Sequence, residues 1–247
     1  MGGLTALQIF VGLIATSLFG FSKTGIPTTG ALGAGLLASV MPALPSTGIA
    51  LPALLVGDLI AVTIFRRNVR VDLILRLLPS VVVGVALGFL VMQNLNQHTG
   101  SIILGVILLI SVLGEVLRRR ESKMLTVSEK RYSKLSQLLG ASAGVSTMIA
   151  NAGGPFMTLY LLRLRIPSRA LMGTMAWFFF ALNLLKVPFS VHLGLINPDS
   201  LVQSMVLVPG ILLGTFVGSR LLGRISTPTF EKLALIGTGV TGLWLLR

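Results

Sequence analysis

The sequence GVSTMIANAGGPFMTLYLL occupies residues 144–162, and the interruption at its centre decides how the chain is built. The residues on both sides are apolar enough for a membrane-spanning helix. The run Asn151-Ala152-Gly153-Gly154-Pro155 cannot continue one in contact with lipid, because exposed backbone polar groups are costly in hydrocarbon. Such breaks are tolerated where protein or a water-filled cavity surrounds them. We therefore interpret 135–162 as a helical hairpin that leaves the membrane on the side where it entered.

A matching interruption lies near the N-terminus, in the sequence GFSKTGIPTTGALGAGLL of residues 20–37. Its first eight residues, 20–27, break an apolar stretch that extends over 4–42, which we interpret as a second hairpin. The first twenty residues lack the positively charged start of a secretory signal, so we expect them to be a retained membrane segment.

The composition is that of a membrane protein with several spans. Of 247 residues, 53% are hydrophobic and only 11% are charged, whereas a soluble domain carries about 25% charged residues. Because there is no cysteine, disulfides, thiolate metal sites and cysteine nucleophiles are excluded. The two histidines, His98 and His192, are far apart in sequence, which argues against a histidine-based zinc motif. We expect neither a metal nor another cofactor.

Uninterrupted apolar segments predict six further spans, because a spanning helix needs about 17–25 mainly apolar residues. These segments are 48–65, 75–93, 101–117, 169–191, 201–219 and 232–246. The fold class that we predict is all-α, a polytopic integral membrane protein.

The net charge of +13 is concentrated between these segments. Most Lys and Arg residues fall in 66–76, 118–134, 163–169 and 220–232. Lys and Arg gather in cytoplasmic loops of membrane proteins, whereas a nucleic-acid binder would carry them on a soluble face. If both interrupted stretches are hairpins, all four basic segments lie on one side, which we predict to be cytoplasmic. The loops 43–47, 94–100 and 192–200, without Lys or Arg, then lie on the other side.

The two halves of the chain resemble each other. The matched pairs, 124 to 130 residues apart, are Gly20 and Gly144, Ser22 and Ser146, Asp58 and Asn183, Pro79 and Pro209, Gly84 and Gly214, and Gly88 and Gly218. The glycine pairs at GxxxG spacing are best explained by close helix packing. Each half consists of a hairpin and three spans, so the second half enters from the opposite face. We predict an inverted-topology repeat, with a first repeat at 1–117, a cytoplasmic linker at 118–134 and a second repeat at 135–247.

The polar residues at the two interruptions predict an anion site where the hairpin tips meet. Helix ends at such breaks present free N–H groups to anionic substrates. The candidate substrate-binding residues are Ser22, Lys23, Thr24 and Gly25 from the first tip and Ser146, Thr147, Asn151, Gly153 and Gly154 from the second. A lysine inside a membrane is a functional hypothesis by default. Lys23 could instead reach the interface or pair with Asp58 for stability.

Three further residues are candidates for the coupling pathway. Asp58 is a carboxylate in the middle of an apolar span, where ionisation is unfavourable, so it could exchange a proton during transport or serve as a structural partner of Lys23. Asn183 is its counterpart in the second half. Lys186, one turn later, could be a second cation in the pathway or extend its long stem to the interface.

Both interruptions, GFSKTGIPTTGALGAGLL and GVSTMIANAGGPFMTLYLL, resemble the paired motifs of the TauE/SafE family of sulfite and organosulfonate exporters. The resemblance covers about residues 5–245, and its second motif is the more specific. It implies a multi-pass transporter of the bacterial inner (plasma) membrane that carries small sulfur-containing anions and is coupled to protons. Many family members have an acidic, glycine-rich first tip where this chain has Ser22-Lys23-Thr24, and an added cation there suits an anion.

The function that we predict is therefore secondary transport of a small anion, such as sulfite or an organosulfonate, by alternating access. The expected partners are this anion, protons and the lipid bilayer, with the chain acting as a monomer or homodimer and not on nucleic acid. Alternatives are a carrier for another small organic acid, a cation antiporter that uses Asp58, and, more remotely, a structural subunit of a membrane complex. An enzyme is not expected, because a nucleophilic serine needs a histidine base within reach and both histidines fall in the predicted loops.

Overall fold

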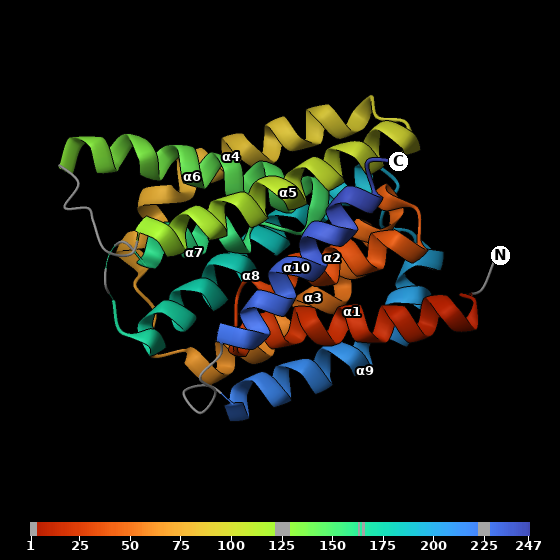
Figure 1. The fold of residues 1–247 in the computed structure, drawn as a ribbon, viewed down its shortest axis with the longest axis horizontal. Coiled ribbons are helices and arrows are strands. Elements are labelled where there is room, and N and C mark those ends of the chain that lie inside the picture. The colour runs from red at the N-terminus through yellow and green to blue at the C-terminus, as the bar shows by residue number, and fades with distance from the viewer. Residues whose placement is uncertain (1–3, 122–128, 163, 165, 222–227) are drawn as a thin grey trace.

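The structure is a computed structural model that describes residues 4–121, 129–162, 164, 166–221 and 228–247 (Figure 1). These residues form helices and no strand, so the all-α prediction is confirmed for this part of the chain. The helices are α1 (Ala6–Thr24), α2 (Thr29–Val40), α3 (Ala43–Phe65), α4 (Val71–Gln93), α5 (Gln97–Glu121), α6 (Glu129–Ala150), α7 (Gly154–Leu162), α8 (Ser168–His192), α9 (Pro198–Leu221) and α10 (Pro228–Trp244).

Six helices of the described residues are long and apolar enough to cross a membrane, namely α1, α3, α4, α5, α8 and α9. The spans predicted at 48–65, 75–93, 101–117, 169–191 and 201–219 fall on helices of this kind, which begin or end a few residues beyond the predicted limits. The span predicted at 232–246 falls mainly on α10, which is not among the six. The predicted loop at 43–47 is wrong, because α3 begins at Ala43, directly after Pro42. Helices α5 and α6 also extend into the predicted linker 118–134, of which residues 122–128 lie outside the described part.

Both interrupted stretches form a long helix, a break and a shorter helix that packs back on the first. Helix α1 packs on α2, and α6 packs on α7. At 1.5 Å per residue, α2 is about 18 Å long and α7 about 14 Å. Since the hydrocarbon core of a bilayer is about 30 Å thick, neither returning helix is long enough to cross it alone. Residues 25–28 and 151–153 are buried or half-buried, so both breaks lie inside the bundle and not at its surface.

The helix ends next to the basic segments lie at one end of the bundle. The end of α3, the starts of α4 and α8, and the end of α9 all lie at the left in Figure 1. Both chain termini and the connections after α4 and α8 lie at the right. Of the basic residues themselves, Lys123, Arg163, Arg165 and Arg224 lie outside the described part of the chain.

Glycines allow the first helix of each interrupted stretch to approach a helix of the other half. A Cβ atom on Gly20 of α1 would meet the carbonyl oxygen of Ile211 in α9, and one on Gly214 would meet that of Ser17. Helices α6 and α4 are in contact in the same way: Gly144 lies against the carbonyl oxygen of Val81, and Gly84 against that of Ala141. The contacts α1–α9 and α4–α6 bind the two halves of the chain to each other.

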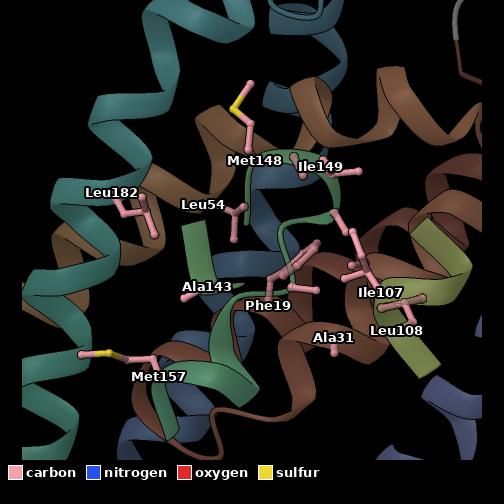
Figure 2. Packing of buried hydrophobic residues seen from close by; sticks show 14 of the residues in the cluster. Phe19, Ala31, Leu54, Ile107, Leu108, Ala143, Met148, Ile149, Met157 and Leu182 are labelled. Carbon is pink, nitrogen blue, oxygen red and sulfur yellow. The ribbon is translucent and has the colours of Figure 1, made fainter. Parts of the chain in front are cut away.

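The apolar core surrounds the second break. Phe19 of α1, Leu54 of α3, Leu108 of α5 and Ile149 of α6, all labelled in Figure 2, belong to one buried cluster. Side chains of α2, α7 and α8 join the same cluster, through Ala31, Met157 and Leu182. Since every helix around the two breaks contributes to this core, the polar residues at the breaks are held in fixed positions.

Candidate functional site

The two breaks have local sequences that end one helix and start the next. At the first, the backbone N–H of Gly25 closes α1 on the carbonyl of Phe21, and Pro27 follows, which has no N–H to continue a helix. At the second, Asn151 has a left-handed backbone with φ of 51°, a conformation that asparagine tolerates better than most residues. Pro155 falls in the first turn of α7, where a missing N–H costs no helical hydrogen bond.

A small cavity lies where the two breaks meet. Its volume is about 30 Å³, and a single water needs about 10–15 Å³ on a comparable measure. The polar residues in its wall are Ser22, Lys23, Thr147, Asn151 and Asn183, and the others are Phe19, Pro27, Gly30, Ala31, Leu54, Gly154, Met175, Ala176 and Phe179. The cavity is therefore assembled from α1, α2, α3, α8 and both breaks, and it has room for two or three waters or one compact ion.

A buried ion pair forms one side of this cavity. The Nζ atom of Lys23 lies 2.6 Å from Oδ1 of Asp58, and the side-chain amide of Asn183 donates to Oδ2 of Asp58, also at 2.6 Å. The ammonium group lies 5.1 Å from the centre of the Phe179 ring, within the range of a cation–π interaction. Both carboxylate oxygens thus have partners. Of the two roles predicted for Asp58, pairing with Lys23 has the geometry that it requires.

A second buried lysine lies behind the opposite wall. Lys186 is 1% exposed, and its Nζ atom donates to the backbone carbonyl of Thr147 and to the side-chain oxygen of Asn151. The amide of Asn151 in turn donates to the carbonyl of Thr47 at 3.1 Å. The second break is thereby tied to α8 on one side and to α3 on the other. One of the two predictions for Lys186 was that its side chain extends to the interface. In the structure the side chain is buried and does not extend there.

Two buried polar atoms beside the cavity have no partner in the described part of the chain. They are the hydroxyl oxygen of Thr147 and the side-chain oxygen of Asn183, and both residues line the cavity. Buried polar atoms are nearly always hydrogen-bonded to protein or to ordered solvent. An occupant with acceptor oxygens can bind the Thr147 hydroxyl, whereas the Asn183 oxygen accepts only and requires a donor such as water.

The structure brings only part of the predicted residues to the cavity. Ser22, Lys23, Thr147, Asn151, Gly154 and Asn183 line it, and Asp58 and Lys186 contact residues that do. The other predicted residues are not among those that line it. Thr24 donates to the carbonyl of Thr215 at 2.8 Å, Gly25 lies against Gly218, Gly153 lies against the side chain of Thr147, and the carbonyl of Ser146 accepts from the N–H of Ala152 within the break.

The cavity residues that the sequence did not reveal are mainly apolar. Phe19, Leu54, Met175 and Phe179 stand in segments where nearly every residue is apolar, so no signal separates them from core or lipid-facing positions. For Phe179, its position four residues before Asn183 on α8 could have indicated the same helix face.

No group of three or more His, Asp or Glu residues that could hold a metal occurs in the described ranges. The chemistry that the cavity offers is therefore hydrogen bonding and positive charge. Lys23 and the hydroxyl of Thr147 can donate to acceptor oxygens, the hydroxyl of Ser22 already donates to the carbonyl of Phe19, and Asp58 is engaged on both oxygens.

A multi-pass membrane protein with a small polar cavity between two broken helices has the construction of a membrane transporter. The family comparison agrees: the model of the family "Sulfite exporter TauE/SafE" matches residues 4–245, nearly the whole chain. The chain belongs to this family, and it is accordingly a membrane transporter and not an enzyme. Comparisons with curated proteins and with solved structures gave no significant match.

Proposed function

We propose that this protein moves a small sulfur-containing anion, such as sulfite or an organosulfonate, through the membrane by alternating access coupled to protons. The observation that carries the proposal is the cavity between the two breaks, with a buried lysine and the unpartnered hydroxyl of Thr147 in its wall, in a chain of the sulfite exporter family. The site comprises Ser22, Lys23, Thr147, Asn151 and Asn183.

The donor groups in the wall suit an oxyanion. Sulfite and sulfonate oxygens only accept hydrogen bonds, while an ammonium group has three hydrogens to donate and a hydroxyl has one. One of the three hydrogens of the Lys23 ammonium group is used by Asp58, so the others remain available to an occupant. A cation antiporter would need a carboxylate oxygen that is free to bind the ion. Because Lys23 and Asn183 occupy both oxygens of Asp58, the geometry favours the anion.

The size of the cavity favours compact sulfur-containing anions over longer ones. A volume of about 30 Å³ corresponds to two or three waters, which suits a compact anion such as sulfite or methanesulfonate. Sulfoacetate carries an additional carboxylate and requires the cavity to widen. We therefore expect the compact anions to bind more tightly than sulfoacetate to this conformation.

The alternating-access part of the proposal rests on the packing between the halves. The contact of Gly20 with Ile211 and the contact of Gly144 with Val81 correspond to each other, because the sequence repeat pairs Gly20 with Gly144 and Val81 with Ile211. The residues of a further repeat pair, Asp58 and Asn183, are hydrogen-bonded to each other beside the cavity. Inverted repeats whose broken helices meet at a central site can expose it to each side in turn by rocking of one bundle against the other.

Calorimetric binding to the purified protein tests the substrate class, with sulfite, methanesulfonate, thiosulfate, sulfoacetate, acetate and chloride as ligands. We expect sulfite and methanesulfonate to bind, and acetate and chloride to bind at least tenfold more weakly. A protein that prefers acetate would be a carrier for organic acids, and the sulfur-anion proposal would then be wrong.

A paired variant locates the site. Lys23→Met combined with Asp58→Asn removes the ammonium donor and its partner together, so no charge is left alone in the bundle. A hydrogen bond to a charged group contributes about 1.5–3 kcal/mol, so the affinity should fall by about one to two orders of magnitude. Lys134→Met, which removes an exposed lysine at the start of α6, is the matched control and should bind as the wild type does.

A further inference from the structure

Lys186 is a buried lysine without a counter-ion. It is 1% exposed, and the two groups that its Nζ atom contacts, the Thr147 carbonyl and the Asn151 side-chain oxygen, are both neutral. No carboxylate of the described residues lies within ion-pair distance of it. A charged group buried in this way is expensive unless it loses its charge or an opposite charge comes close.

The charges that surround Lys186 do not provide this compensation. Helix α3 contributes Asp58 and α1 contributes Lys23, two opposite charges that are already paired with each other. The other helices packed on α8 carry Asp72 and Arg76 on α4, which are exposed, and Tyr160 on α7, whose hydroxyl lies 3.5 Å from the carbonyl of Leu73 near the start of α4. A protonated Lys186 would thus leave the buried cluster with one excess positive charge.

The hydrogen bonds of Lys186 fit the neutral amine. A neutral amine has two hydrogens and one lone pair, and the two observed acceptors take up both hydrogens. An ammonium group has a third hydrogen, and no third hydrogen bond from Nζ occurs among the described residues. The two residues that hold the Nζ atom, Thr147 and Asn151, also line the cavity, so Lys186 is separated from an occupant by a single layer of side chains.

We propose that Lys186 is the proton-binding residue of the transport cycle. Its amine is neutral while the cavity is empty, and the Nζ lone pair takes up one proton when a monovalent anion enters. The positive charge of the ammonium then balances the anion, and the proton leaves when the anion leaves. No bond in the substrate changes. This inference rests on the proposed function, and it assigns coupling to Lys186, while Asp58 remains ionised in its pair with Lys23.

The test measures proton uptake upon anion binding. Methanesulfonate is the probe, because it is a monovalent anion at every working pH, so any proton that is taken up binds to the protein. Purified protein in weakly buffered detergent solution is mixed with methanesulfonate, and a pH-sensitive dye reports the protons. We expect about one proton per bound anion at alkaline pH, and a dissociation constant that rises about tenfold per pH unit there, as linkage to one proton requires.

Lys186→Arg separates charge from proton exchange, because arginine keeps its charge at every working pH. This variant should bind methanesulfonate with an affinity that does not change with pH, and it should take up no proton. Lys186→Met should lose both the proton uptake and at least tenfold in affinity. Lys134→Met, which removes an exposed lysine, should retain both wild-type properties.

The outcomes separate the two proposals. If the wild type binds methanesulfonate without taking up protons, or if Lys186→Arg still takes up a proton, Lys186 is not the coupling residue, although the transported anion stays as proposed. Loss of proton uptake in Asp58→Asn, together with normal uptake in Lys186→Arg, would assign the proton to Asp58 and overturn this inference. If the wild type binds neither methanesulfonate nor sulfite, the proposed function is wrong and this inference falls with it.

Discussion

The pair of Lys23 and Asp58 joins α1 to α3 at the cavity, and Asn183 extends this link to α8. Removal of one partner of a buried ion pair costs about 3–5 kcal/mol, because the other charge is left uncompensated, whereas removal of both often costs little. We predict that Lys23→Met and Asp58→Asn each lower the melting temperature in detergent and that the double variant recovers most of the loss. A double variant no more stable than either single variant would contradict this role for the pair.

Two threonines from the predicted site should behave in opposite ways. The hydroxyl of Thr24 donates to the carbonyl of Thr215, away from the cavity, while the hydroxyl of Thr147 has no partner in the described residues and borders the cavity. Thr24→Val should cost about 1 kcal/mol of stability and leave anion affinity unchanged. Thr147→Val should leave stability nearly unchanged and weaken the binding of sulfite about tenfold or more. Thermal unfolding and calorimetric titration of both variants check this. The reverse pattern would place the anion at Thr24.

At the scale of elements, the sequence predicts helices well where neighbouring residues in the chain determine whether a helix can continue. Both breaks fall where proline follows glycine and polar residues, at 20–27 and 151–155, whereas the prolines Pro52, Pro79, Pro188 and Pro209 lie inside helices. The start of α3 was predicted five residues too late, since Ser46 and Thr47 resemble a polar loop. In the structure the hydroxyl group of each donates to a carbonyl three residues earlier, so the helix accommodates them.

The glycine contacts give a prediction for helix packing. A Cβ atom on Gly84 would meet the carbonyl of Ala141, and one on Gly214 would meet that of Ser17, so Gly84→Ala and Gly214→Ala should force α4 from α6 and α9 from α1. We expect both to lower the melting temperature by several degrees and by similar amounts. Gly239→Ala in α10 is the matched control, because nothing lies within 4 Å of its Cβ position, and it should be neutral. A neutral Gly84→Ala would show that this contact has room to relax.

For the whole molecule, the sequence predicts which residues of the two halves correspond, but not which side chains are in contact. The 125-residue offset pairs Asp58 with Asn183, yet their hydrogen bond depends on how α3 crosses α8. The contact of Lys186 with Asn151 depends on the left-handed backbone at the second break, which places that side chain between α3 and α8. Such contacts are set by the packing of segments far apart in the chain, and neither periodicity nor composition encodes them. The site residues could therefore be predicted as candidates, and their arrangement could not.

The orientation of the bundle in the membrane gives the last prediction. Arg67 and Arg169 belong to basic segments at one end of the bundle, and Gln97 and Asn197 lie at the other end, beside connections that carry no Lys or Arg. Because basic residues are retained in the cytoplasm, we predict that the first pair faces the cytoplasm and the second pair the outside. The native chain contains no cysteine, so single cysteines at these four positions can be labelled without background. A membrane-impermeant maleimide added to intact cells should react at positions 97 and 197, and at 67 and 169 only after the cells are opened. Labelling of position 169 but not of position 67 in intact cells would mean that the chain crosses the membrane an odd number of times between them. The second interrupted stretch would then be a single span, and the inverted repeat would be wrong.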